Sequence, residues 1–469
     1  MTTTSAIVVW TTAKDGLSEV TYNTGASPPS TAAATSTLFT EPAIGGQQER
    51  SYYVHVAQLT GLQPGTSYSY TISTGGTLLA PNVSFRTDSG PQDTTLSFAV
   101  VGDSGTLGPN QTGIRDAMLG RDYEMVLHTG DLAYTHGTYS ELDQSFFPPY
   151  GQIMRRVPFY PAMGNHDYET LNGQPYRDVF YLPENAPAQH RESYYSFDYG
   201  PVHFVSLDTE ILGGYRGGLA EASDQLAWLD NDLASTSQPW KVVFLHRPSY
   251  PSSNIPVYPN PIAVTPILQQ RGVDIVFSGH DHLYARTLPM IDGAPELIGN
   301  GGVIYPTTGG GGGGKHLCEP RPYTAICLRM YHFLHVTVEN DCVLSYDAIT
   351  FSSGVIDHFE LNRCDPDSDS DGFLDGEEVA AGSDPLDPAS TPLPTATPTP
   401  TPSGATGDAN CDATVSSIDA ALLLQWSAGL LPAVPCELLA DVNSDGEVTA
   451  IDAALILQYV AGLLSHLPL

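Results

Sequence analysis

Residues 1–90 carry short runs in which apolar and polar side chains alternate, the pattern of strands with one buried face. Turn-forming residues separate these runs, most clearly at the Pro64-Gly65 pair. The pattern predicts four strands, at residues 7–10, 20–22, 52–56 and 68–73. Short strands separated by turns are typical of an all-β sandwich, so we expect an N-terminal β-sandwich over residues 1–90.

Between residues 95 and 362 the pattern changes to continuous apolar strands that alternate with helical periodicity. Strands are predicted at residues 98–101, 125–128, 202–207, 241–245 and 273–277, and helices at residues 111–119, 221–233 and 262–270. Strands of this kind are buried on both faces and covered by helices. We therefore expect a central α/β layered domain whose polar motifs follow its strands.

The C-terminal part is not uniform. Residues 365–390 are acidic, and residues 391–406 form a linker of Pro and Thr that has no core of its own. Residues 407–469 contain an internal repeat, in which residues 418–431 closely match residues 451–464. Each repeat combines an acidic stretch with a helical pattern, so we expect a small α-helical domain at this end.

Length and charge narrow the classes of function. A chain of 469 residues is too long for one core. Its formal net charge is −34, and no Lys or Arg follows Arg363, so the last quarter is strongly acidic. Such a surface repels nucleic acid and anionic membranes, and we expect neither as a partner. No apolar run is long enough to span a bilayer.

The six cysteines favour an oxidising compartment, because no Cys-x-x-Cys pair suggests zinc binding or redox chemistry. Cys411 and Cys436 lie beyond the linker, and we expect them to pair with each other. The other four would pair among themselves in an order that the sequence leaves open. No signal peptide precedes the first strand, so we expect that the natural N-terminus lies upstream and that the protein is extracellular or attached to the cell surface.

Five polar motifs follow predicted strands or begin turns in the central domain. They lie at residues 102–105 (Gly-Asp-Ser-Gly), 130–134 (Gly-Asp-Leu-Ala-Tyr), 164–167 (Gly-Asn-His-Asp), 243–246 (Val-Phe-Leu-His) and 279–282 (Gly-His-Asp-His). Each motif alone has an ordinary explanation as a turn or a buried imidazole, but five in this order are not expected by accident. Their carboxylates, amide, phenol and imidazoles suit a trivalent and a divalent metal ion. Two such ions neutralise a phosphate and supply a nucleophile near neutral pH.

In these motifs the chain resembles the metallophosphoesterases and, within them, the purple acid phosphatases. The resemblance covers about residues 5–362 and implies a four-layer αββα sandwich for the central domain. Tyr134 is the discriminating residue, because most calcineurin-like phosphoesterases have no Tyr at this point. Residues 59–70 also resemble the end of a fibronectin type III domain, whose first strand is cut short in this chain.

The resemblance implies two metal subsites that share Asp131. An Fe³⁺ ion would be held by Asp103, Asp131, Tyr134 and His282. A divalent ion (Fe²⁺, Zn²⁺ or Mn²⁺) would be held by Asp131, Asn165, His246 and His280.

The resemblance also implies hydrolysis of a phosphomonoester by in-line attack of a metal-bound hydroxide, without a phosphoenzyme. His166 would contact the substrate or protonate the leaving alkoxide, and Asp167 would orient His166 through a hydrogen bond. Tyr134 would help to keep the ferric ion oxidised and would colour the protein.

Residues 307–314 form a glycine-rich stretch that is followed by Lys315 and His316. We predict a flexible loop here, and leave open whether it covers the site as a lid or phosphate cradle or is a plain loop. His136, His190 and Tyr250 are weaker candidates for residues that line the cleft.

Residues 367–378 have the spacing of a calcium loop. Its ligands would be Asp367, Asp369, Asp371, Asp375 and Glu378. The stretch resembles a thrombospondin type 3 calcium repeat, and the alternative is a solvated acidic linker.

Each copy of the internal repeat also has the ligand spacing of a calcium loop. The first loop would bind Ca²⁺ through Asp408, Asn410, Asp412 and Asp419, and the second through Asp441, Asn443, Asp445 and Asp452. The two loops with their helices resemble a dockerin, the module through which a secreted enzyme binds to a cohesin. Two ions would fold it by neutralising carboxylates that otherwise repel.

We therefore predict a secreted dinuclear-metal acid phosphatase, docked to a partner by a calcium-dependent tail. One alternative is a phosphodiesterase or nucleotidase that uses the same metals. The other is a surface-anchored binding protein with a vestigial metal site.

Overall fold

The structure is a computed structural model. It describes residues 1–364, apart from 27, 45, 47, 91–92, 217, 257–260, 297–301 and 353, and then residues 383, 390, 406–410, 414–428, 431, 434, 436–443 and 448–467. The described residues fall into two compact units, one formed by residues up to 364 and the other by the described residues from 383 onward. No helix among the described residues has the length and apolar character needed to cross a membrane.

The N-terminal domain is an antiparallel β-sandwich. Its strands are β1 (Ser5–Thr12), β2 (Ser18–Asn23), β3 (Ser30–Glu41), β4 (Arg50–Thr60), β5 (Ser67–Thr74) and β6 (Thr77–Arg86), in the order β1-β4-β3-β2-β5-β6. Strand β3 pairs with β2 through residues 30–33 and with β4 through residues 34–41, so it joins the two halves. The sequence pattern misses β3 because its Ser, Thr and Ala side chains are mostly exposed and give no alternation.

Two mixed sheets form the centre of the molecule. The first has the order β21-β20-β19-β7-β8-β9 and the second the order β10-β11-β12-β13-β17-β14-β18. The first sheet contains β7 (Thr95–Val101), β8 (Met125–His128), β9 (Phe159–Pro161), β19 (Phe333–Glu339), β20 (Val343–Thr350) and β21 (Gly354–Asn362). The second contains β10 (Tyr195–Tyr199), β11 (Val202–Leu207), β12 (Trp240–Leu245), β13 (Ile275–Ser278), β14 (Tyr284–Thr287), β17 (Pro306–Thr308) and β18 (Thr324–Leu328).

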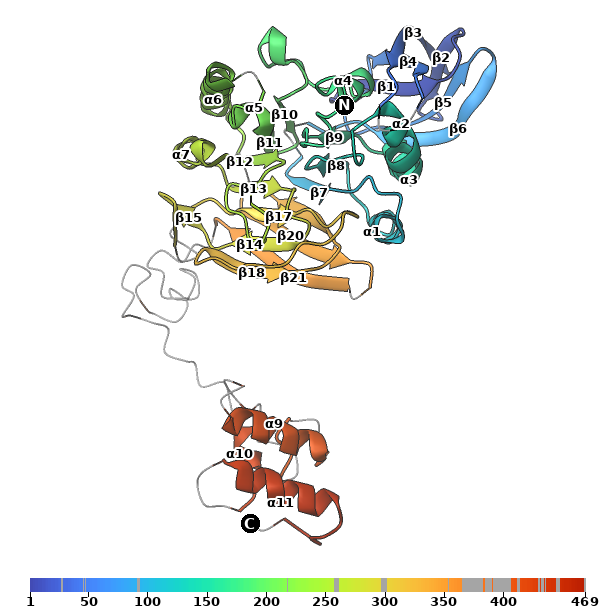
Figure 1. Ribbon diagram of the computed structural model, residues 1–469. Coiled ribbons are helices and arrows are strands. Elements are labelled where there is room, and N and C mark those ends of the chain that lie inside the picture. The colour runs from blue at the N-terminus through green and yellow to red at the C-terminus, as the bar shows by residue number, and fades with distance from the viewer. Residues whose placement is uncertain are drawn as a thin grey trace. The chain divides into compact units, whose positions relative to one another are not determined.

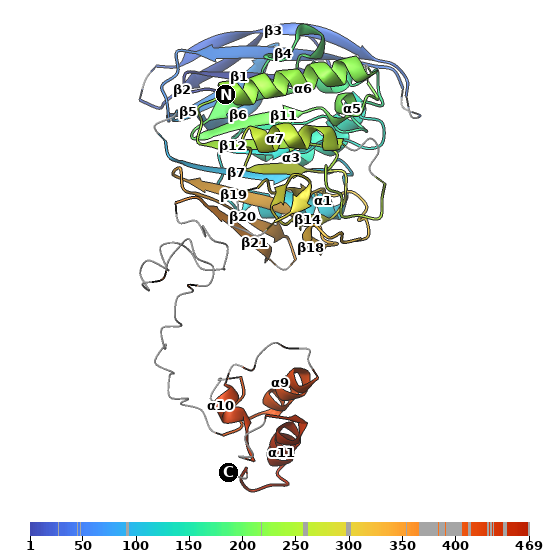
Figure 2. The same ribbon diagram turned by 90° about the vertical axis from the view of Figure 1, so that its left-hand side faces the viewer.

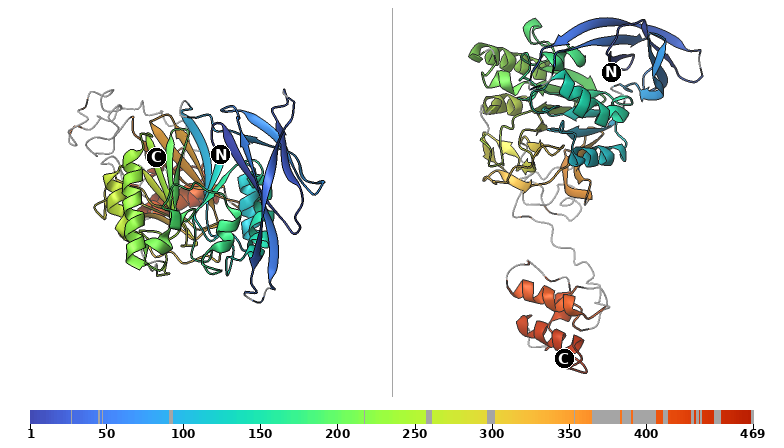
Figure 3. Two further views of the ribbon diagram at one scale, coloured as in Figure 1. Left: turned by 90° about the horizontal axis from the view of Figure 1, so that it is seen from above. Right: turned by 45° about the vertical axis from the view of Figure 1, so that its right-hand side comes forward.

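Helices cover the outer face of each sheet, which gives four layers. Helices α5 (Thr209–Leu212), α6 (Gly218–Ser235) and α7 (Thr265–Gln270) lie on one side of the stacked sheets, and α1 (Pro109–Leu119) and α3 (Phe147–Met154) lie on the other (Figure 1). The side view shows α6 and α7 in front of β11 and β12 (Figure 2), and the view from above shows the strands between the helices (Figure 3). The predicted sandwich, layered α/β domain and C-terminal helices are confirmed.

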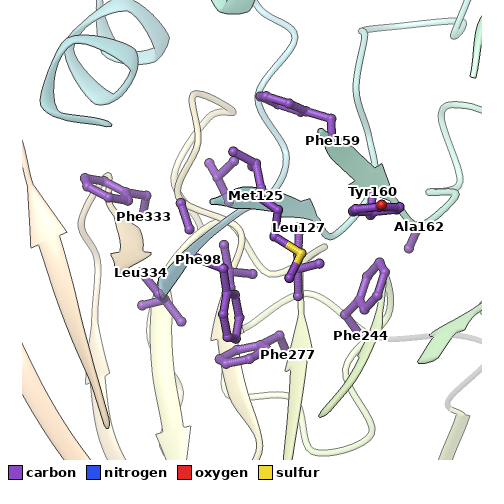
Figure 4. Close-up of a cluster of buried hydrophobic side chains, with 14 of the residues drawn as sticks. Phe98, Met125, Leu127, Phe159, Tyr160, Ala162, Phe244, Phe277, Phe333 and Leu334 are labelled. Carbon is purple, nitrogen blue, oxygen red and sulfur yellow. The ribbon is translucent and has the colours of Figure 1, made fainter. Parts of the chain in front are cut away.

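The space between the sheets is filled by aromatic and aliphatic side chains (Figure 4). The ring of Phe98 on β7 meets Phe204 and Phe277 of the second sheet edge to face, at centroid distances of 5.3 Å and 6.3 Å. Such pairs each add about 0.5–1.5 kcal/mol beyond the burial of their area. This packing fixes the two sheets against each other, and with them the loops at the strand ends.

The parallel strands end at the same level within each sheet. Val101 pairs with His128, and His128 pairs with Pro161, so β7, β8 and β9 end side by side. Leu207, Leu245 and Ser278 are aligned in the same way in the second sheet. Because the carboxyl ends of parallel strands meet at one edge, the register brings all five polar motifs to one edge of the stacked sheets.

The N-terminal domain packs against a loop that follows one of these motifs. The carboxylate of Glu41 accepts hydrogen bonds from the backbone of Tyr139 and, at 3.2 Å, of Ser140, both in α2 (Tyr139–Glu141). Tyr52 stacks on Tyr139 with their centroids 3.5 Å apart. The sandwich therefore holds the segment that immediately follows Tyr134.

A buried histidine ties β10, β11 and α6 together. His203 lies 2.6 Å from an oxygen of Asp198 and 2.9 Å from an oxygen of Asp232. Burial opposes a charge on this ring, but the two hydrogen bonds raise the pKa of His203 to about 9. The imidazolium therefore stabilises the fold at neutral pH.

Two disulfide bonds settle the pairing that the sequence left open. Cys318 pairs with Cys327, and Cys342 pairs with Cys364. The predicted bond between Cys411 and Cys436 involves Cys411, which lies outside the described residues.

The C-terminal unit holds the two repeated helices, α9 (Ser417–Ser427) and α11 (Ala450–Val460), and the short α10 (Glu437–Ala440). Each long helix begins with a capping box, formed by Ser416 with Asp419 and by Thr449 with Asp452. The same carboxylates accept the backbone N–H groups of Asn410 and Val442. Each loop is thus tied to the first turn of its helix.

The other predicted calcium ligands lie partly outside the described residues. Asp408, Asn410, Asp441 and Asn443 are described, whereas Asp412, Asp445 and the whole of the predicted loop 367–378 are not. The calcium assignments therefore stay predictions.

Candidate metal centre

Three candidate ligands lie at strand ends in a backbone conformation that is rare for residues with side chains. The φ angles of Asp103, Asp131 and His280 are 58°, 54° and 64°. Each such residue costs about 1–3 kcal/mol, which the surrounding structure must supply. The neighbouring glycines are needed for close approach, because a Cβ on Gly164 would lie 2.2 Å from Asp131 Oδ1. Strain of this kind concentrates at functional sites.

One cluster joins a carboxylate, a phenol and an imidazole. The hydroxyl of Tyr134 donates to Asp103 Oδ1 at 3.2 Å and lies 3.2 Å from His282 Nε2. His282 Nε2 is also 3.3 Å from Asp103 Oδ1. These three residues were predicted as ligands of the ferric ion, and they come from three separate loops.

The second cluster surrounds the imidazole of His246. Its Nε2 atom lies 3.1 Å from Asn165 Oδ1, 3.3 Å from His280 Nδ1 and 3.5 Å from Asp131 Oδ1. These are the four residues predicted to bind the divalent ion. Ligand atoms of Asp103, Asp131 and His246 all lie within 4.8 Å of one another, so Asp131 connects the two clusters.

Backbone carbonyls orient two of the imidazoles. His246 Nδ1 donates to Thr129 O, and His282 Nδ1 donates to Gly314 O, both at 2.8 Å. These hydrogen bonds from Nδ1 direct each Nε2 atom at the cluster, which is the orientation in which Nε2 binds a metal ion. His280 instead presents Nδ1, and its Nε2 lies 3.2 Å from Arg247 Nη1.

The electrostatics of the site suit cations. Burial opposes charge on both Asp103 and His282, but their contact lowers the pKa of Asp103 and raises the pKa of His282 to about 9. Burial and the neighbouring His246 and Arg247 lower the pKa of His280 to about 2, so this ring is neutral. Burial and two aspartates raise the pKa of the Tyr134 phenol well above its usual value.

The donor set fits two metal ions. Two buried carboxylates, an amide oxygen, a phenol and three imidazoles converge, which combines hard oxygen donors with nitrogen donors. Buried carboxylates are costly unless a cation or hydrogen bonds compensate them.

His166 lies beside the clusters, partly open to solvent. Its Nδ1 donates to the carbonyl oxygen of Thr135 at 2.6 Å, and its Nε2 lies 4.0 Å from Asp131 Oδ2. The predicted hydrogen bond from Asp167 to His166 is wrong. The Asp167 carboxylate is occupied by three backbone N–H groups, those of Asp131, Leu132 and Gly164, at 2.9, 3.0 and 2.8 Å. Asp167 therefore holds two ligand-bearing loops together, and Thr135 orients His166.

The glycine-rich stretch is not a flexible loop, and this prediction is also wrong. Residues 309–313 are buried, and their backbone bonds to the ligand loops, with Gly311 N donating to Gly102 O and Gly313 N donating to Asp103 O, both at 2.9 Å. A Cβ on Gly313 would lie 2.5 Å from His282 Cε1. The stretch packs closely behind the cluster of Asp103, Tyr134 and His282, and side chains do not fit there.

Sequence reasoning missed Arg247 and gave His316 no role of its own, although both contact the ligands. Arg247 forms a buried ion pair with Glu210 and reaches His280, and its position directly after His246 was the available signal. His316 stacks on His282 with their centroids 4.3 Å apart. Of the weaker candidates, Tyr250 packs against Tyr305 and Tyr323, away from the clusters.

The stacked sheets, with carboxylates, an amide and imidazoles at the ends of their parallel strands, define a metallophosphoesterase. Residues 96–284 match the calcineurin-like phosphoesterase family, and residues 1–87 match the N-terminal domain of purple acid phosphatases. Residues 406–461 match the dockerin type I domain, and residues 367–388 match the bacterial TSP3 repeat. The chain is a purple acid phosphatase-like metallophosphoesterase with a C-terminal type I dockerin domain.

Individual relatives agree with this assignment. The acid phosphatase type 7 of Mus musculus is 27% identical over 71% of this chain and 82% of its own length. Purple acid phosphatase 21 of Arabidopsis thaliana is 30% identical over 53% of this chain and 58% of its own. A purple acid phosphatase from yellow lupin seeds shares the fold, with a TM-score of 0.66 at 24% identity over 77% of this chain and 72% of that one.

Proposed function

We propose that this protein hydrolyses phosphomonoesters at a dinuclear metal centre, with Asp103, Tyr134 and His282 around one ion, Asn165, His246 and His280 around the other, and Asp131 between them. The observation that carries the proposal is the convergence of these seven side chains, from five loops of two sheets, into two adjoining clusters. When bound, such ions neutralise the phosphate and supply the nucleophile.

Tyr134 favours a strongly Lewis-acidic ion in the first cluster, because a phenol oxygen is a hard donor. Its phenol lies in a buried site beside two carboxylates, which raise its pKa well above the usual value. A bound cation of high charge density lowers the pKa of a coordinating phenol, because the charge of the ion acts directly on the oxygen. We therefore propose Fe³⁺ in this cluster and a divalent ion, Fe²⁺, Zn²⁺ or Mn²⁺, in the second.

The protein side chains have separate tasks around the substrate. His166 Nδ1 donates to the carbonyl oxygen of Thr135, which leaves Nε2 to contact the phosphate or, when the ring is an imidazolium, to give its proton to the leaving alkoxide. Arg247 is held by Glu210, which keeps its charge beside His280.

The test compares hydrolysis of 4-nitrophenyl phosphate and bis(4-nitrophenyl) phosphate by protein loaded with iron and a divalent metal. The proposal predicts a strong preference for the monoester. A strong preference for the diester would instead establish the phosphodiesterase alternative, which uses the same donor atoms. A broad visible absorption band that disappears in Tyr134→Phe would support the ferric assignment.

We further propose that the dockerin domain binds Ca²⁺ and docks the enzyme, outside the cell, to a cohesin. Apolar side chains are exposed at matching positions of its two helices, with Ile418 and Ile451 59% and 60% exposed and Leu424 and Leu457 44% and 41% exposed. Exposed apolar groups of this kind favour a protein partner. The disulfides of the catalytic unit fit an extracellular location.

A further inference from the structure

A cavity outside the metal centre carries cationic side chains. It has a volume of about 510 Å³ and is lined by residues from three segments of the chain, among them Tyr168, Arg177, His190, Ile211, Arg216 and Glu221. None of these is a predicted metal ligand. In a chain with 18 Lys and Arg against 52 Asp and Glu, two arginines and a histidine in one cavity are unusual.

Two nitrogen atoms that line this cavity have no hydrogen-bond partner among the described residues, whereas Arg177 donates to Asn172 O. The side chain of His190 is 7% exposed, and its Nε2 has no hydrogen-bond partner within the described residues. The same holds for Nε of Arg216, whose guanidinium lies over the ring of Tyr168 at 5.0 Å from the centroid. A buried donor without a partner costs about 1–3 kcal/mol, so the Arg216 Nε–H group favours a ligand that accepts hydrogen bonds.

The charge of the cavity is positive. The carboxylate of Glu221 also lines it, 3.8 Å from His190 Nε2, and is 38% exposed. Two guanidinium groups outweigh this one carboxylate. Guanidinium groups bind phosphate and carboxylate through paired hydrogen bonds.

Two elements connect the cavity to the metal centre. Tyr168 lines the cavity and follows His166 and Asp167 directly in the chain. On the other side, α5 presents Ile211 to the cavity, while the preceding Glu210 holds Arg247 against His280. The backbone N–H groups of Tyr215 and Arg216 both donate to Glu210 O, which fixes Arg216 to the same turn.

We propose that this cavity binds a second anionic group, phosphate or carboxylate, on the alcohol part of the substrate, so that the enzyme prefers phosphomonoesters whose leaving group is itself an anion. The inference rests on the proposed phosphatase function. Arg216 is a specificity-determining residue in this proposal, and Arg177 and His190 complete the anion site.

The experiment measures kcat/KM of the metal-loaded protein with three six-carbon substrates, glucose 6-phosphate, glucose 1,6-bisphosphate and 6-phosphogluconate. The first carries no second anion, the second carries a phosphate and the third a carboxylate. We expect the anionic substrates to be preferred about tenfold or more, because a buried hydrogen-bonded charge pair contributes at least that much. A preference for the bisphosphate alone would assign the cavity to phosphate, and a preference for both would assign it to either anion.

The variant Arg216→Gln should remove this preference while leaving kcat/KM for glucose 6-phosphate within about twofold, and Arg216→Lys should restore part of it. Arg191→Gln is the matched control, because Arg191 is 55% exposed, pairs with Glu184 and does not line the cavity. Equal rates for all three substrates, or equal losses in Arg216→Gln, would overturn the cavity's role while the phosphatase function stands. Failure to hydrolyse any of the three would overturn the phosphatase function and the cavity's role with it.

Discussion

The variant Asp167→Asn tests whether this residue holds the ligand loops, as the structure indicates, or tunes His166. Asp167 Oδ2 accepts from Asp131 N and Gly164 N, and Oδ1 accepts from Leu132 N. An amide can keep the first two bonds, but its NH₂ group must then face the N–H of Leu132. One hydrogen bond is lost and one buried N–H loses its partner, which costs about 2 kcal/mol of unfolding free energy.

Because Asp131 and Asn165 depend on these bonds for their position, we also expect the affinity for both metal ions to fall about 10- to 100-fold. Urea denaturation gives the first quantity, and metal titration followed by hydrolysis of 4-nitrophenyl phosphate gives the second. Asp178→Asn is the control, since Asp178 is also buried but binds Tyr52 and Gln174 instead of the ligand loops. It should lose stability without losing metal. Unchanged stability and metal affinity in Asp167→Asn, together with a shifted pH profile of activity, would refute this reasoning and return Asp167 to the role of orienting His166.

Three further predictions concern other parts of the molecule. Gly313→Ala should lower the unfolding free energy by about 1–3 kcal/mol and weaken metal binding, because its Cβ meets His282, whereas Gly314→Ala, with nothing within 4 Å, should change neither in denaturation and metal titrations. Because the folded-state pKa of His203 is raised to about 9, its contribution of about 2 kcal/mol is complete below pH 6.5 and is lost as the pH rises through 9. Urea titrations from pH 6 to 10 should show this loss in the parent and a flatter profile in His203→Gln. Removal of Ca²⁺ by a chelator should reduce helical circular dichroism and abolish cohesin binding, and Asp452→Asn should weaken both in the presence of Ca²⁺; a chelated protein with unchanged spectrum and binding would contradict the calcium assignment.

The sequence predicts the strands that carry the site because they are continuous apolar runs followed directly by polar residues. Strand β7 is an example, since burial on both faces leaves only its tip for Asp103. The strands that follow β13 were not predicted. Strands such as β18 are half-buried at most positions and have no clear alternation, and only their neighbours in the sheet define them.

The clusters themselves could be predicted from the kinds of residue and their order, whereas the contacts behind them could not. In the sequence, the glycines at residues 309–313 predict a flexible loop. The fold instead packs them against Gly102, Asp103 and His282, where no side chain fits. In the same way, Asp167 follows Gly164 by three positions in the chain, and only the structure shows that the backbone N–H groups of Asp131 and Leu132 also donate to its carboxylate.

The most direct test of the dinuclear phosphatase is a joint measurement of bound metal and hydrolysis in the parent and in Asp131→Asn. Asp131 is the residue between the two clusters, so its loss should affect both ions. In the parent we expect about two transition-metal ions per chain and hydrolysis of 4-nitrophenyl phosphate. In the variant we expect loss of at least one ion and a decrease in kcat/KM of roughly 1,000-fold. Hydrolysis at the parent rate in the variant, or a parent that binds no transition metal, would contradict the account.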